Sequence, residues 1–75
     1  MKNARFISVF DAKPKNNGWY AILYCWEVQE GFFPSAAHWN GDKFDSSLPV
    51  SNWVDKIFSI KEDAAKFALD NDPDW

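Results

Sequence analysis

The segment Trp19–Trp26 (WYAILYCW) limits the possible folds of this chain more than any other. Eight consecutive apolar residues, rich in aromatic side chains, predict a β-strand. Side chains alternate between the two faces of a strand, so one face would carry Trp19, Ala21, Leu23 and Cys25, and the other Tyr20, Ile22, Tyr24 and Trp26. Because both sets are apolar, the pattern is typical of a central strand, with one face on the core and the other partly covered or used for binding.

The length of the chain, 75 residues, allows one small domain. A chain of this length buries only about 60% of the surface that it exposes when unfolded, so its core depends on large side chains. Aromatic residues make up 19% and hydrophobic residues 47% of the sequence, against 25% charged residues, a balance that excludes an intrinsically disordered protein. We therefore expect a single domain over residues 1–75, of which 70–75 form a short acidic tail.

Three further segments are expected to form strands beside Trp19–Trp26. Arg5–Phe10 and Trp53–Phe58 combine β-branched and aromatic residues. Phe32–Trp39 has the same character but contains Pro34, which places it at an edge or a bulge of a sheet.

A hairpin turn is predicted after the third of these strands. Asn40-Gly41 is the preferred pair for a two-residue type I′ turn, from which Asp42–Asp45 would return as a strand. Ser46–Asn52 contains Pro49 and is expected to be a loop.

A helix is predicted near the C-terminus. Ser59 and Glu62 fit a capping box, with Ser59 as N-cap and Glu62 at the third helical position. An apolar stripe with helical spacing follows, Asn71 can end the helix, and Pro73 prevents its continuation. The expected fold is α+β: an antiparallel β-meander of four or five strands with one C-terminal helix packed on a face.

The residues that could support catalysis are few. Cys25 and His38 are the only candidates for a nucleophile and its base, and they fall on different predicted strands. Cys25 lies within the most apolar strand, where burial raises the pKa of a thiol and lowers its reactivity. We expect Cys25 to be structural and the protein not to be an enzyme.

A metal site is also not expected. Asp70, Asp72 and Asp74 have the spacing that begins some calcium loops, but the glycine and the closing glutamate of such a loop are missing. The sequence therefore predicts neither a metal nor another cofactor, and a solvated acidic tail.

Charge is distributed unevenly along the chain. Residues 1–18 hold four basic residues and one acidic residue, a net charge of +3, whereas residues 62–75 hold five acidic residues and one lysine, a net charge of −4. A clustered basic face, which nucleic-acid binding requires, is weak here. A protein partner with a basic surface could instead meet the acidic end.

The N-terminal segment has no long apolar region typical of a signal peptide, and no stretch approaches the roughly 20 apolar residues of a membrane span. The single cysteine excludes an intramolecular disulfide and fits a reducing compartment. We expect a cytoplasmic protein without a membrane partner.

Aromatic residues exceed what a one-sided core of this size needs. The surplus comes from Trp19, Tyr20, Phe32, Phe33, Trp39, Phe44, Trp53 and Trp75. One helix covers one face of a sheet, so part of this set is expected on an uncovered face. Such a patch is typical of protein-binding surfaces. Two alternatives stay open: a single-stranded nucleic-acid-binding module that stacks bases on the sheet aromatics, and a self-associating structural module, such as a homodimer.

Several short motifs resemble those of a known group of proteins. They are Phe6-Ile7-Ser8-Val9, Pro14, Gly18-Trp19-Tyr20, His38-Trp39-Asn40-Gly41-Asp42-Lys43-Phe44 and Val50-x-x-Trp53. Over about residues 5–54 the chain resembles the short tryptophan-rich domains of unknown function found in phage and prophage genomes. The resemblance implies a small α+β accessory protein of phage type, with no catalytic residues to carry over.

These observations together favour a non-enzymatic phage-type accessory protein. It would bind and modulate a protein of a bacterial host, with inhibition as the expected effect. A defence complex such as a CRISPR effector is one such target, which would make the chain an anti-CRISPR protein in a host–virus interaction. The residues expected to contact the partner are Asp63, Asp70, Asp72, Asp74, Trp75, Trp39, Asn40 and Asp42.

Overall fold

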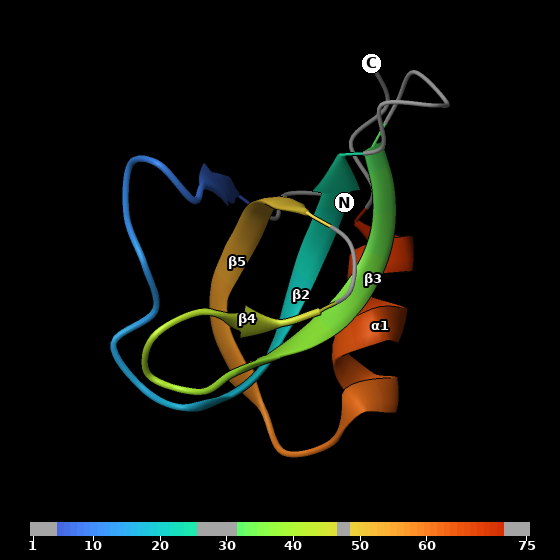
Figure 1. The fold of residues 1–75 in the computed structure, drawn as a ribbon. Helices are drawn as coiled ribbons and strands as arrows, with labels where there is room; N and C mark the ends of the chain where they lie inside the picture. The colour runs from blue at the N-terminus through green and yellow to red at the C-terminus, as the bar shows by residue number, and fades with distance from the viewer. Residues whose placement is uncertain (1–4, 26–31, 47–48, 72–75) are drawn as a thin grey trace.

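The structure, a computed structural model, describes residues 5–25, 32–46 and 49–71, with the backbone alone for Cys25 and Phe32. Its elements are β1 (Phe6–Ser8), β2 (Gly18–Cys25), β3 (Phe32–Trp39), β4 (Phe44–Asp45), β5 (Val50–Phe58) and α1 (Lys61–Asp70) (Figure 1). The strands form one antiparallel sheet in the order β1-β5-β2-β3-β4.

The α+β class, the five antiparallel strands and the helix packed on the sheet are confirmed. β2 is the central strand, as its two apolar faces predicted. β2, β3 and β4 follow one another as a meander, whereas β5 lies between β1 and β2 and pairs with both. The first and last strands of the chain are therefore neighbours.

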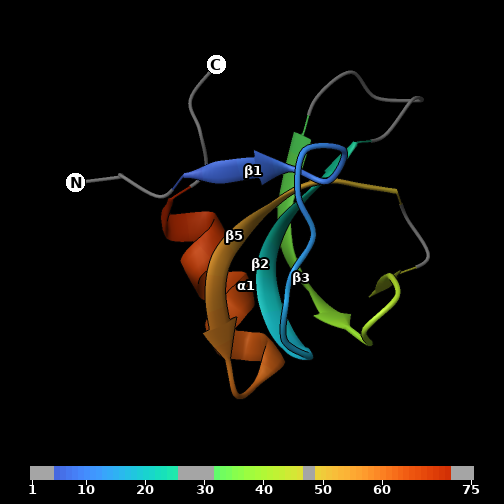
Figure 2. The same ribbon diagram turned by 90° about the vertical axis from the view of Figure 1, so that its left-hand side faces the viewer.

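Both faces of the sheet are covered, each by a different kind of residue. On the helix side, buried alanines let α1 lie close to β2 and β3: Ala21, Ala36, Ala64 and Ala68. On the other side the curled sheet encloses a core of large side chains: Tyr20, Ile22, Ala37, Trp39 and Trp53. In Figure 2, α1 lies on one side of the curved strands and β4 on the other.

The expectation of an uncovered aromatic face is therefore wrong for Tyr20, Trp39 and Trp53, which are buried, whereas Phe33 of the same set is exposed. The sheet curls round the core that holds Tyr20, Trp39 and Trp53. Val9–Asn17 runs along the side that the curl leaves open (Figures 1 and 2). The curl has a local cause in the pairing of β5 with β2, where the register shifts twice along the ladder. Such bulges bend a strand and increase the twist of a sheet.

Several predicted element ends differ from the structure. The strand expected over Arg5–Phe10 ends at Ser8, because the chain turns there: the backbone N–H groups of Asp11 and Ala12 both donate to the Ser8 carbonyl. The loop expected over Ser46–Asn52 is wrong for its last three residues, which belong to β5.

The capping box predicted for the helix is also wrong. α1 begins at Lys61, so the N-cap is Ile60, which has an extended backbone and makes no side-chain capping bond. The cause is β5, which runs to Phe58 and leaves two linking residues, so Ser59 lies one position too early to cap. Asn71 ends the helix as predicted: its backbone N–H and its side-chain amide both donate to the Phe67 carbonyl, at 3.0 and 2.9 Å.

Trp53 fastens the Val9–Asn17 segment to the sheet. Its ring is 3% exposed in the core, and its indole Nε1 donates to the Ala12 carbonyl at 3.0 Å. Trp53→Phe keeps an aromatic ring but removes this donor and part of the buried surface. We expect it to lower the free energy of unfolding by about 1–3 kcal/mol and to speed amide exchange in Val9–Asn17, measured by urea denaturation and hydrogen exchange.

Trp19→Phe is the matched control, because Trp19 is half-buried on the helix side of β2. Amide exchange in Val9–Asn17 should be unchanged in this variant. Equal acceleration of exchange in both variants would show that general loss of stability, rather than the Trp53 bond, controls this segment.

Tyr20 is expected to make the free energy of unfolding depend on pH in the alkaline range. Burial raises the pKa of its phenol above the usual value of 10.0, and the Asp55 carboxylate raises it further. A group with a raised pKa in the folded state contributes stability that is complete below its unfolded pKa and is lost as pH rises through its folded pKa. We expect the free energy of unfolding to fall above about pH 10, and the fall to be smaller in Tyr20→Phe, measured by denaturation across that range. In Tyr24→Phe, where Tyr20 is still present, a fall that disappeared would contradict this assignment.

Candidate binding site

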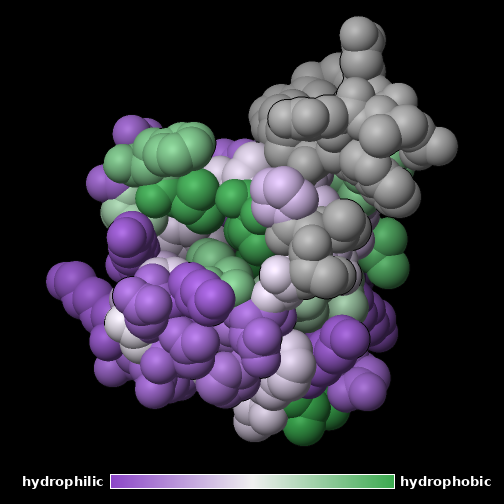
Figure 3. All heavy atoms as spheres, viewed as in Figure 1, coloured by the Kyte–Doolittle hydropathy of each residue, from purple (hydrophilic) through white to green (hydrophobic). Residues whose placement is uncertain are grey.

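A pocket of about 330 Å³ opens beside the aromatic core, between the Val9–Pro14 segment and the β3–β4 hairpin. It is lined by Val9, Phe10, Ala12, Lys13, Pro14, Trp39, Asp42, Lys43, Phe44 and Val50. We call it the loop pocket. In Figure 3 it corresponds to the hollow between the green residues at the upper left and the purple residues below them.

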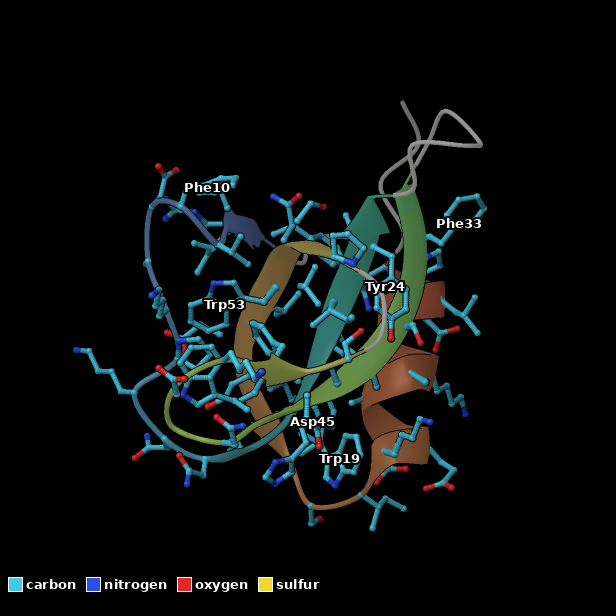
Figure 4. All side chains as sticks on the ribbon, in the orientation of Figure 1. Phe10, Trp19, Tyr24, Phe33, Asp45 and Trp53 are labelled. Carbon is cyan, nitrogen blue, oxygen red and sulfur yellow. The ribbon has the colours of Figure 1, made fainter. Side chains whose placement is uncertain are left out.

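The first wall of the loop pocket is held by bonds to its backbone. Val9 N–H donates to the Ser51 carbonyl at 3.0 Å, and the Trp53 indole holds the Ala12 carbonyl. Between Val9 and Ala12 the chain reverses direction. The side-chain oxygen of Ser8 stabilises this turn by accepting a hydrogen bond from the Phe10 N–H at 3.2 Å. The turn directs Phe10 outward at the edge of the wall, where it is 94% exposed (Figure 4).

The second wall is the β3–β4 hairpin. The predicted hairpin is present, but its type I′ turn is wrong, because Asn40 has a negative φ and type I′ needs positive φ at both central residues. Asn40 instead pairs with Lys43: its N–H donates to the Lys43 carbonyl, and its side-chain oxygen accepts from the N–H groups of Asp42 and Lys43 at 2.9 and 3.0 Å.

Gly41 lies at the first central position of this turn, with φ +98°, a conformation that glycine adopts without strain. A Cβ at this position would lie 3.3 Å from the side-chain oxygen of Asn17. The tip of the hairpin therefore approaches the end of the Val9–Asn17 segment closely.

The floor of the loop pocket is apolar and packed against the core. Trp39 is 5% exposed, and its ring meets that of Phe44 edge to face, with centroids 5.0 Å apart. Phe44 in turn meets Tyr20 edge to face at 6.2 Å. These contacts tie the floor to the main core, so an apolar group entering the pocket would meet a preformed surface.

The charged groups of the loop pocket are confined to its rim. Lys13, Asp42 and Lys43 are exposed, and among the described residues no polar or charged residue is buried. Protein–protein interfaces commonly combine an apolar centre with a polar rim. Small-molecule sites usually hold precisely placed polar groups inside.

The predicted contact residues divide between two faces. Trp39 forms the floor of the loop pocket, Asp42 lies on its rim, and Asn40 shapes its hairpin wall. Asp63 and Asp70 lie instead on the exposed face of α1. The remaining predicted residues, Asp72, Asp74 and Trp75, are outside the described part of the chain.

Asp63 and Asp70 border a shallow hollow of about 250 Å³ floored by Phe58 and Phe67. The ammonium group of Lys56 lies over both rings, 5.2 and 4.9 Å from their centroids. A cation of the chain itself thus already contacts the aromatic surface of this hollow, which leaves it less suited to an outside ligand than the loop pocket.

The strand register separates the two residues considered for catalysis. His38 pairs with Trp19 and Cys25 pairs with Phe32, so the two residues are six positions apart along the β2–β3 ladder, about 20 Å. They cannot act as nucleophile and base on one substrate. In the described part of the chain, no group of three histidine, cysteine, aspartate or glutamate residues could hold a metal.

Sequence reasoning missed Phe10, Lys13 and Lys43 as site residues. Phe10 was expected inside a strand, whereas it follows the strand and points outward. The dense turn residues of Asp11–Gly18 signalled a loop, but no local pattern shows which distant segment a loop will face.

Comparison of the chain with protein-family models, curated proteins and solved structures found no match. The resemblance to phage tryptophan-rich domains stays a prediction. No helix within the described residues is long and apolar enough to cross a membrane.

The Asn40 side chain can be tested as the brace of the hairpin wall. Asn40→Ala removes the acceptor of two backbone bonds, and we expect it to lower the free energy of unfolding by about 1–2 kcal/mol. Asn40→Asp keeps a side-chain oxygen at the same position and should change stability by less than about 0.5 kcal/mol. Chemical denaturation measures both, and equal losses would contradict the bracing role.

Proposed function

We propose that this protein is a non-enzymatic binding module that captures an apolar side chain of a protein partner in the loop pocket. The observation that carries the proposal is the position of Phe10, a large apolar side chain left almost fully exposed at the edge of a pocket with an aromatic floor. A partner that covered the pocket would bury Phe10 as well.

The size of the effect fits a binding role. Burying a phenylalanine side chain stabilises by about 2 kcal/mol, which corresponds to roughly 30-fold in affinity. Aromatic residues beside a pocket, ringed by polar groups that exclude water, are the usual centre of binding energy in protein interfaces. Phe10 and the loop pocket together supply this combination.

The alternative of base stacking on the sheet aromatics is not favoured. Tyr20 and Trp53, two of the rings that would have to contact the bases, are buried in the core. Self-association through the edge of β3 is also not favoured, because Pro34 lies in that edge and lacks the N–H that strand pairing uses.

The biological setting proposed for this binding is the one that the sequence suggested. A phage-type accessory protein that inhibits a host protein, such as a CRISPR effector, would need a small folded domain with one surface that binds the host protein. The fold supports that role by fixing both walls of the pocket to a single core.

Site-specific photo-crosslinking tests the proposed surface. A photoreactive phenylalanine analogue replaces Phe10 in the full chain, which is then irradiated in bacterial lysate, and adducts are identified by mass spectrometry. We expect a discrete protein adduct, and its yield should fall in competition with unlabelled protein but not with unlabelled Phe10→Ser.

Position 69 provides the matched control, since Leu69 is also a large exposed apolar residue, 61% exposed, but lies on α1. The same analogue at this position should give no such adduct. Crosslinks from position 69 alone would move the binding surface to the helix and contradict the proposal.

A further inference from the structure

The rim of the loop pocket carries a charge pattern that the floor does not explain. Lys13 comes from the first wall and Lys43 from the hairpin wall, so each wall contributes one lysine to the pocket. Both side chains are exposed. Two lysines and one acidic residue, Asp42, line the pocket, so its lining has a charge of +1 in a chain whose net charge is −3; Asp11 belongs to the same wall segment but does not line the pocket.

We infer that the ligand of the loop pocket is an acidic peptide segment: an aromatic or large aliphatic side chain with aspartate or glutamate residues on both sides of it. This inference rests on the proposed function and specifies the partner's chemistry. The apolar side chain would enter between the walls, and the flanking carboxylates would meet Lys13 and Lys43. Charges complementary across an interface steer encounter and fix the orientation of the bound segment.

Asp42 allows the proposed charge preference of the pocket to be tested with a substitution of opposite expected effect. It lies next to Lys43 on the hairpin wall and would repel a carboxylate at the same rim. Its N–H contributes to the turn, but its exposed carboxylate is free to be neutralised by substitution without loss of that backbone bond. Removing the negative charge of Asp42 should therefore strengthen binding, whereas removing either positive charge should weaken it.

A random-peptide display library selected on the full-length protein provides the test. We expect enriched peptides to combine one aromatic or large aliphatic residue with flanking aspartate or glutamate. Selection on the double variant Lys13→Gln/Lys43→Gln should keep the apolar residue and lose the acidic preference.

Affinity of the strongest synthetic peptide is then measured by calorimetry. The double variant should bind it roughly two- to tenfold more weakly, because exposed charge pairs contribute modestly. Asp42→Asn should bind it more tightly, Lys66→Gln on α1 should leave affinity unchanged, and wild-type affinity should fall between about 0.05 M and 0.5 M salt. Every substituted side chain is exposed, and denaturation curves check that each variant folds.

The outcomes separate the inference from the function on which it rests. Enriched peptides that lose binding in Phe10→Ser but show no acidic preference, or that bind the lysine double variant equally well, overturn the inference and leave the proposed function standing. Peptides whose binding does not depend on Phe10, or no enrichment at all, overturn both. Binding of RNA oligonucleotides in place of peptides, lost in the lysine variant, would also overturn both.

Discussion

β2 presents apolar side chains on both faces, and a chain of 75 residues has few elements with which to cover them. The helix covers the side on which β2 carries Ala21 and Leu23, and the small side chain of Ala21 lets the backbone of α1 come close. The opposite side is covered by the sheet itself, which bends at the irregular pairing of β5 until Trp39 and Trp53 meet Tyr20. Placement of the other elements follows from this double requirement.

Aromatic content alone is a poor guide to surface function in a domain of this size. Small cores have too little volume for many aliphatic contacts, and a few large rings bury more area for each residue fixed. Tyr20, Trp39 and Trp53 are used in this way, so these three members of the surplus inferred from composition form the interior of the curl. The exposed ring that remains beside the pocket, Phe10, is not one that composition singles out.

The strands and the helix could be predicted because their signals are local. The run Trp19–Cys25 and the apolar stripe before Asn71 each belong to one element, β2 and α1. The insertion of β5 between β1 and β2 could not, because it depends on which distant strand fits the curl. The candidate site could be predicted only in part for the same reason. Trp39 and Asp42 were identified within one hairpin. The opposing wall comes from a segment about thirty residues earlier in the chain, and its approach depends on tertiary packing.

The hydrogen bond from the Trp53 indole to the Ala12 carbonyl joins the interior of the protein to one wall of its pocket. Ligand binding in the pocket and folding of the chain are therefore thermodynamically linked. A ligand that binds only the folded state raises the free energy of unfolding in proportion to the logarithm of the ratio of ligand concentration to Kd, when the ligand is well above Kd. The coupling acts in both directions. Substitutions deep in the core, far from any contact with a partner, would change affinity by altering how firmly the wall is held, so a search for binding mutants would recover some positions that no partner ever touches.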